Sequence, residues 1–292
     1  MTVDQFLQYI FSGITNGSIY ALTALCFTLI FNSTQIINFA QGQMVMLGGM
    51  VAVAICGAGL PLWAGVLLAV AVVTVISIVL ERVAVRPLAG RGLLVQIVAT
   101  VAVSFILEWA AMRLWGREAV TLAPFPGGNE PLRVGGATLT WQALWVVGLT
   151  VLIVAGLQLF YRKSLFGTAI RACAVNPMAA RLQGVSYRGV VIFSFALAGA
   201  ISAIAGAAIT PISFMSYRQG ALLGLKGFAA ATLGGLGSPV GAVFGGFVLG
   251  IVEALSVPLV SAGYKDVIAF VILLLVLFLR PSGLLGRRAV EG

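Results

Sequence analysis

The sequence predicts an all-α protein, a polytopic bundle of about eight or nine transmembrane helices, some of them short or broken. Of its 292 residues, 61% are hydrophobic and 9% are charged, whereas a soluble domain has about 25% charged residues. So few charges cannot cover a surface that faces water, so most of this surface must face lipid. The chain also divides into apolar runs near the roughly 20 residues that a helix needs to cross a bilayer. We expect residues 1–292 to form a single membrane domain.

Nine apolar runs mark the predicted helices. They cover residues 6–31, 36–57, 61–80, 93–114, 141–161, 189–212, 220–236, 239–257 and 264–279. The seventh and eighth runs are short and rich in glycine, so they predict either two true spans or one re-entrant hairpin. Pairs of small residues four positions apart predict helices that pack closely. These pairs are Gly199/Ala203, Ser202/Gly206, Gly241/Gly245 and Gly246/Gly250.

The loops between the runs carry charges that indicate which side of the membrane each loop faces. Basic residues dominate segment 81–92, segment 162–188 and the tail from Arg280 onward, and segment 162–188 has no acidic residue. Cytoplasmic loops are rich in lysine and arginine, so these three segments should be cytoplasmic. Segment 115–140 balances its charges and contains three prolines, which is typical of an external loop. The net charge of +9 therefore reflects membrane topology, and we expect no nucleic-acid partner.

Segment 162–188 also has the features of a helix that docks on a cytoplasmic partner. Asn176 followed by Pro177 predicts a helix start, and Gly184 would end a short amphipathic helix. Its alanines would let that helix lie in a groove, and its arginines would meet acidic groups at the rim. The candidate docking residues are Arg171, Asn176, Pro177, Ala179, Ala180, Arg181 and Gly184. The simpler alternative is a basic loop at the lipid headgroups.

Three amides interrupt the second apolar run. Asn38, Gln41 and Gln43 lie beside Gly42, which would allow a break in the helix. Broken helices near the midplane of a membrane often line solute sites. Buried amides also join helices through hydrogen bonds. The residues support the two interpretations equally.

Four ionisable residues fall within the predicted spans: Glu108, Arg113, Lys226 and Glu253. Each such group costs at least about 2.5 kcal/mol in a membrane and suggests a function. Arg113 lies near a span end, where its side chain can reach the headgroups. Lys226 and Glu253 would have similar depths if their helices are antiparallel, so we expect an ion pair or a solute contact. The candidate residues of the substrate path are Asn38, Gln41, Gln43, Lys226 and Glu253.

The sequence offers little support for chemistry within this chain. It contains no histidine, which removes histidine-based acid–base catalysis and metal binding. Its three cysteines lack metal-site spacing. Segment 220–226 has the wrong glycine spacing for a phosphate loop, and no serine or threonine follows Lys226. We therefore expect no cofactor and no enzymatic activity, and any ATP hydrolysis would belong to another subunit.

Seven stretches, spread in order over nearly the whole chain, carry a family resemblance. They are NGSIYALTAL (16–25), IINFAQGQMVMLGG (36–49), ERVAVRPL (81–88), GTAIRACAVNPMAARLQGV (167–185), GLKGFAAATLGGLGSPVGAVFGGFVLGIVEAL (224–255), YKDVIAF (264–270) and RPSGLLG (280–286). Each stretch alone is weak, but together they are specific. In this order they resemble the branched-chain amino acid ABC transporter permeases of the LivH type.

This resemblance implies a permease of the bacterial cytoplasmic membrane that imports branched-chain amino acids or related amino-acid or amide solutes by alternating access. It implies as partners a second, LivM-type permease, two cytoplasmic ATP-binding subunits and a periplasmic or extracellular solute-binding protein. Segment 167–185 would then hold the docking helix. The family usually has His and Glu where this chain has Gln41 and Gln43, so the solute stays open among branched-chain amino acids, urea, other amides and other small acids.

The main alternative is a secondary transporter coupled to H⁺ or Na⁺. That class usually needs acidic or histidine relays deep in the membrane, and here only Glu108 and Glu253 are available. A channel is less favoured because no ring-forming polar filter is evident. An intramembrane enzyme is least favoured because no catalytic pair is evident.

Overall fold

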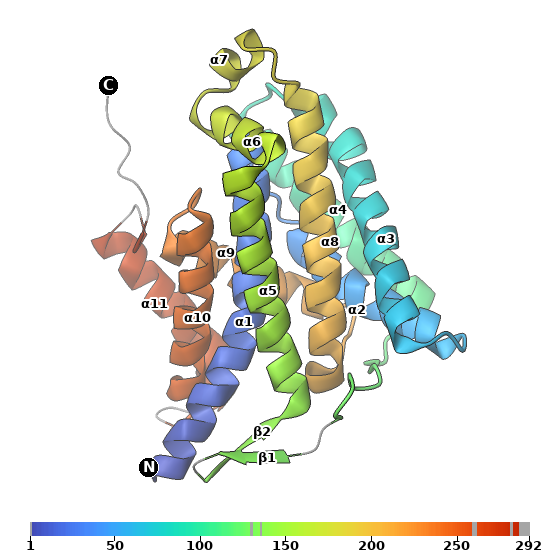
Figure 1. Ribbon diagram of the computed structural model, residues 1–292, viewed down its shortest axis with the longest axis vertical. Coiled ribbons are helices and arrows are strands. Elements are labelled where there is room, and N and C mark those ends of the chain that lie inside the picture. The colour runs from blue at the N-terminus through green and yellow to red at the C-terminus, as the bar shows by residue number, and fades with distance from the viewer. Residues whose placement is uncertain (1, 129–130, 135, 259–261, 281–282, 286–292) are drawn as a thin grey trace.

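The computed structural model describes residues 2–128, 131–134, 136–258, 262–280 and 283–285. Over these residues the chain is a bundle of helices with a β-hairpin at one end (Figure 1). The elements in chain order are α1 (Val3–Thr34), α2 (Gln41–Gly57), α3 (Leu62–Leu80), its π-helical continuation (Glu81–Val85), a 3-10 turn (Arg86–Leu88), α4 (Leu93–Trp115), β1 (Pro131–Val134), β2 (Ala137–Thr140), α5 (Trp141–Lys163), α6 (Leu165–Val175), α7 (Pro177–Leu182), α8 (Tyr187–Ser213), α9 (Gln219–Gly234), α10 (Pro239–Ser256), a 3-10 turn (Ala262–Tyr264) and α11 (Lys265–Leu279). Each predicted apolar run contains a helix, which confirms the all-α class.

Six of the described helices are long and apolar enough to cross a membrane: α1, α3 with its continuation to Leu88, α4, α5, α8 and α10. Helices α2, α9 and α11 have 17, 16 and 15 residues. At about 1.5 Å per residue, each falls short of the roughly 30 Å of hydrocarbon. The glycine-rich seventh and eighth runs become two separate helices, α9 and α10, and only α10 has the length of a full span.

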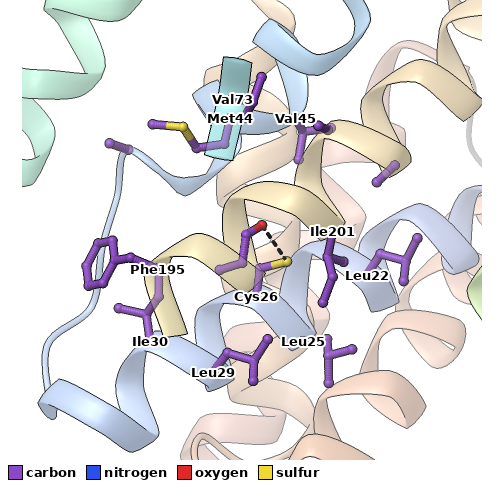
Figure 2. Close-up of a cluster of buried hydrophobic side chains, with 14 of the residues drawn as sticks. Leu22, Leu25, Cys26, Leu29, Ile30, Met44, Val45, Val73, Phe195 and Ile201 are labelled. Atoms are coloured by element: carbon purple, nitrogen blue, oxygen red, sulfur yellow. Dashed lines mark hydrogen bonds between the residues drawn. The ribbon is translucent and has the colours of Figure 1, made fainter. Parts of the chain in front are cut away.

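Helix α1 lies at the centre of the bundle. It is buried along most of its length and packs against α8, α9 and α10. Figure 2 shows Leu25 of α1, Met44 of α2 and Phe195 of α8 in one apolar cluster. Within this cluster the Cys26 thiol donates a hydrogen bond to the carbonyl oxygen of Ala198, at 3.4 Å. The outer helices α3, α4 and α5 are mostly exposed and turn large apolar side chains outward, as expected of helices that face lipid.

Glycines set the position of α10 between two neighbours. A methyl group on Gly246 would overlap the backbone of Ala21 in α1. A methyl group on Gly245 would overlap the backbone of Ala230 in α9. The other member of each predicted pair, four residues away, faces the same helix. Both pairs therefore allow close packing, as predicted, but they face different helices.

Helix α8 also approaches its neighbours at small residues. Gly199 faces Ser77 of α3, and Gly206 faces the backbone of Val45 in α2. The backbone of Ala203 lies against Gly48 of α2. The small residues of the sixth apolar run therefore have the packing role that the sequence predicts.

The two ends of the bundle carry different elements. Helices α6 and α7 lie at one end, and the N-terminus and the β-hairpin lie at the other (Figure 1). Segment 81–92 lies at the α6–α7 end, so two of the three basic segments share one end, as the charge pattern predicts. Segment 115–140 lies at the opposite end, and its hairpin was not predicted. Gln8 Oε1 accepts a hydrogen bond from the Thr138 amide at 2.8 Å, which ties the hairpin to α1. The basic residues 287 and 288 of the tail lie outside the described residues.

The break near the three amides lies earlier than the sequence predicts. Helix α1 ends at Thr34, Gln35 has a left-handed backbone with φ 58°, and α2 begins at Gln41. Gly42 therefore lies in the first turn of α2 and does not make the break. A methyl group on Gly42 would overlap the backbone of Gly220 in α9. This glycine is used for close packing, and the irregular stretch 36–40 supplies the break.

We predict that Gly246→Leu destabilises the bundle by about 3 kcal/mol or more, because its side chain would displace the α1 backbone rather than a flexible side chain. The matched control is Gly148→Leu in α5, where an added methyl group meets no atom within 4 Å. This variant should not destabilise the bundle, because a glycine inside a helix is about 0.5–1 kcal/mol less favourable than a residue with a side chain. Unfolding of the purified chain in detergent measures both, and equal stability of the two variants would contradict this account of the α1–α10 contact.

Candidate functional site

A buried ionic cluster joins four helices. Lys226 Nζ of α9 lies 2.9 Å from Glu253 Oε1 of α10 and 2.6 Å from Asp266 Oδ1 of α11. The Lys226 ammonium also donates a hydrogen bond to the Tyr20 hydroxyl of α1 at 3.1 Å. That hydroxyl donates to Glu253 Oε1 at 3.3 Å. The predicted ion pair between Lys226 and Glu253 is therefore confirmed, and it has two further members.

Neither Tyr20 nor Asp266 was predicted from the sequence to join this cluster. Asp266 is the second residue of α11, and Glu253 lies in the last turn of α10. Glu253 and Asp266 lie at the adjoining ends of two consecutive apolar runs. Their proximity in the sequence could have indicated that both carboxylates contact the same lysine. Tyr20 gave no such signal, because a tyrosine in an apolar run is usually read as a core residue. Two carboxylates and one ammonium give the cluster a net charge of −1.

A cavity of about 330 Å³ opens beside this ionic cluster. We call it the α1–α9 cavity, because residues of these two helices form much of its wall. The end of α8, the segment that follows it and the start of α11 complete the wall. Its lining residues are Asn16, Ile19, Tyr20, Ile209, Ser213, Phe214, Met215, Gln219, Leu222, Leu223, Lys226, Lys265 and Asp266. Since α8 starts next to α7 and ends at Ser213, the cavity lies at the end opposite α6 and α7.

The three amides lie elsewhere and are fully buried. Gln41 Nε2 donates to Ser202 Oγ of α8 at 2.6 Å, and Gln43 Nε2 donates to Ser104 Oγ of α4 at 3.0 Å. Asn38 Oδ1 accepts from the Ala40 amide at 3.1 Å. The two glutamines thus join α2 to α8 and α4, which is the helix-joining role. A role for these amides in the substrate path stays a prediction.

The two charged residues of α4, Glu108 and Arg113, do not belong to the ionic cluster. Glu108 is half-buried and Arg113 is exposed. Arg113 lies in the last turn of α4, so it is close to a span end, as expected. Neither residue lines the α1–α9 cavity.

The docking segment contains two capped helices. Ser164 Oγ accepts a hydrogen bond from the Gly167 amide at the start of α6. Asn176 Oδ1 accepts from the amides of Met178 and Ala179, both at 3.0 Å, at the start of α7. Pro177 is the first residue of α7, and Gly184 follows its end with φ 82°. The predicted helix is therefore present over Pro177–Leu182, whereas α6 was not predicted.

The candidate docking residues are not equally available to a partner. Ala179 and Arg181 are exposed, but Ala180 is 5% exposed and packs within its own chain. The Arg181 guanidinium lies over the Tyr187 ring, 4.3 Å from its centroid, and Arg171 donates a hydrogen bond to Thr168 Oγ1 at 3.1 Å. A large side chain at Ala180 would therefore disturb the fold of α7, and only Ala179 is a clean probe of docking.

The family model described as branched-chain amino acid transport system / permease component matches residues 9–277. The chain belongs to this family of permeases. It is similar to the high-affinity branched-chain amino acid transport system permease protein LivH of Escherichia coli (strain K12), with 34% identity over 98% of this chain and 97% of that one. It is also similar to the corresponding permease protein BraD of Pseudomonas aeruginosa, with 32% identity over 99% and 98% of the two chains.

A solved structure has a related fold. PsaBC from Streptococcus pneumoniae in complex with Fab matches 95% of this permease and 92% of its own chain, with a TM-score of 0.50 and 16% sequence identity. This similarity concerns the fold alone. Together with the six apolar helices, family membership makes the protein a multi-pass membrane permease of an ABC transport system, which functions with other components of that system.

We predict that the ionic cluster of the permease is energetically coupled. Lys226→Met leaves two carboxylates without their cation and should cost about 3–5 kcal/mol. Glu253→Gln should cost less, because Asp266 still neutralises Lys226. The double variant should lose at least about 1 kcal/mol less than the sum of the single losses. Glu108→Gln combined with Lys226→Met is the control and should be additive. Strict additivity of Lys226→Met and Glu253→Gln in detergent unfolding would show that the pair does not form.

Cysteine labelling separates the two roles of the amides. Cysteines replacing Asn38, Gln41 and Gln43 one at a time, in a permease without its native cysteines, should be unreactive in the conformation described here, because all three side chains are buried. If they line the path, a water-soluble thiol reagent should label at least one of them during transport. Ala179→Cys, which is exposed, is the positive control. Protection in every transport state would assign the amides to helix joining alone.

Proposed function

We propose that this permease is the membrane-spanning subunit of an ATP-driven importer in the bacterial cytoplasmic membrane. It would move branched-chain amino acids, or related small amino-acid or amide solutes, by alternating access. The proposed partners are a second, LivM-type permease, two cytoplasmic ATP-binding subunits and a periplasmic or extracellular solute-binding protein. The relatives LivH and BraD are named as permease proteins of high-affinity branched-chain amino acid transport systems, which supports this solute class.

The observation that carries the proposal is the α6–α7 segment. Two consecutive short helices, each with a side-chain cap, stand at the end of the bundle that holds the basic segment 81–92. Val175 and Leu182 of this segment are 86% and 80% exposed, and Met178 is also exposed. Apolar side chains that project from a basic, capped element suit a groove on a cytoplasmic partner better than they suit water.

The sequence also supports the proposal of a separate ATP-binding partner. Segment 220–226 lacks the glycine spacing and the hydroxyl residue of a phosphate-binding loop. ATP-driven transport would therefore require a separate ATP-binding subunit, and force would have to cross an interface at the cytoplasmic end. The α6–α7 segment is the element best suited to transmit it, because its caps fix both helices and make it rigid.

A secondary transporter is the remaining alternative. It would need an acidic group free to take up H⁺ or Na⁺ within the membrane. Glu253 is paired with Lys226 and accepts a hydrogen bond from Tyr20, which favours a fixed structural role over ion coupling. Glu108 is then the acidic residue left among the candidates from the sequence.

We predict that Ala179→Trp weakens or abolishes assembly with the ATP-binding subunit, or uncouples ATP hydrolysis from uptake, without altering membrane insertion. The reason is steric, since Ala179 is exposed on α7 while the spans lie elsewhere. Ala89→Trp is the matched control, because Ala89 is also exposed and follows the 3-10 turn in the other basic segment of the same end. Co-purification of the ATP-binding subunit and uptake in vesicles measure the effect. If the Ala179→Trp variant assembles normally with the ATP-binding subunit and the Ala89→Trp variant does not, the docking site lies in segment 81–92.

A further inference from the structure

We infer that the α1–α9 cavity holds the charged end of a zwitterionic solute, with Asp266 receiving its ammonium group and Lys265 its carboxylate. This inference rests on the proposed function and adds to it a location and a basis for recognition. It also separates amino acids from the neutral amides that the proposed function leaves open.

The wall of the cavity combines opposite charges with apolar surface. Lys265 and Asp266, consecutive residues at the start of α11, place a cation and an anion on the same cavity. Asn16 of α1 and Gln219 of α9 add uncharged hydrogen-bonding groups. The rest of the wall is largely isoleucine, leucine, methionine and phenylalanine. Small-molecule sites combine apolar side chains with polar groups that orient the ligand, and in this wall the two kinds of residue are about equally represented.

The charges of the ionic cluster make Asp266 the natural partner of an ammonium group. Lys226 is shared between two carboxylates, which leaves one negative charge uncompensated within the cluster. The side chain of Glu253 is 5% exposed, whereas that of Asp266 is 37% exposed. The uncompensated charge is therefore accessible at Asp266 and not at Glu253. A cationic group in the cavity would neutralise it.

A zwitterionic solute suits this wall better than a neutral amide does. Its carboxylate would be next to Lys265 when its ammonium group is next to Asp266, so binding adds no net charge to a partly buried site. A neutral amide such as urea has no ammonium group to neutralise the remaining negative charge at Asp266 and no carboxylate to pair with Lys265. The volume of about 330 Å³ is at the lower end of the roughly 300–1,000 Å³ of ligand pockets. It therefore has room for a small solute such as an amino acid.

The place of the cavity agrees with entry of solute from outside. It lies at the end opposite the α6–α7 segment, which the charge pattern assigns to the cytoplasm. A solute released by a binding protein would reach this end first. The cavity would then be the first site at which the permease itself binds and selects the solute.

The first test fills the cavity. Leu222→Trp introduces a large side chain into the wall, whereas Leu225→Trp, on the same helix, lies outside it. The two leucines are matched, since they are 44% and 46% exposed. The assembled importer, in nanodiscs and without its binding protein, is titrated with radiolabelled L-leucine. We expect Leu222→Trp to weaken binding at least tenfold and Leu225→Trp to leave it unchanged. Equal binding by both variants, or an equal loss in both, would overturn the inference.

The second test examines the charges. We expect 4-methylpentanoate, which lacks the ammonium group, and 3-methylbutylamine, which lacks the carboxylate, each to compete at least tenfold more weakly than L-leucine. Asp266→Asn should remove the preference for L-leucine over 4-methylpentanoate, because an amide no longer favours an ammonium group. A merely structural role of Asp266 would lower binding of both compounds and keep their ratio, and that result would overturn the inference.

The two hypotheses fail in different ways. If the complete importer with ATP and its binding protein takes up no amino acid, the proposed function is wrong. If uptake is normal in the wild-type importer and also in the Leu222→Trp variant, the proposed function stands and the cavity is not a solute site.

Discussion

The close approach of α1 and α10 is the constraint on which the rest of the bundle depends. Helices in lipid gain little by burying apolar side chains against one another, because the lipid is equally apolar, so their association relies on close contact. Gly17 of α1 and Gly250 of α10 bring the two backbones together with no side chain between them. This contact places Tyr20 within hydrogen-bond distance of Glu253. The ionic cluster is therefore a consequence of helix packing.

The polar groups inside the bundle form two sets with different surroundings. The ionic cluster reaches the α1–α9 cavity through Asp266. The amide set is closed, because Gln41 and Gln43 are fully buried and donate to serines on two other helices. Burying a polar group without a partner is costly in a low-dielectric interior, and the amide set is only partly paired, since Asn38 Nδ2, Gln41 Oε1 and Gln43 Oε1 are buried without a hydrogen-bond partner among the described residues. The same bundle thus keeps one polar set near solvent and uses the other to hold α2 in place.

In the proposed importer the two ends of the bundle would have different tasks. One end carries capped short helices with exposed apolar side chains. The other end carries the cavity and the ionic cluster. Helix α1 spans between the two ends and packs against α8, α9 and α10. In the proposed alternating-access mechanism, movement of these helices relative to α1 would link events at the two ends.

The sequence alone determined the membrane class, the positions of the apolar helices of the bundle, the basic end and the family, because hydropathy, charge asymmetry and motif order are local properties. It also placed Lys226 and Glu253 at similar depth, which predicted either an ion pair or a solute contact, and the structure shows the ion pair. Only the tertiary structure added Tyr20 and Asp266 to that pair and showed that Ala180 faces its own chain. It also placed the helix break before Gly42. These features depend on how helices rotate and approach one another, and that is decided by close contacts between residues far apart in the sequence.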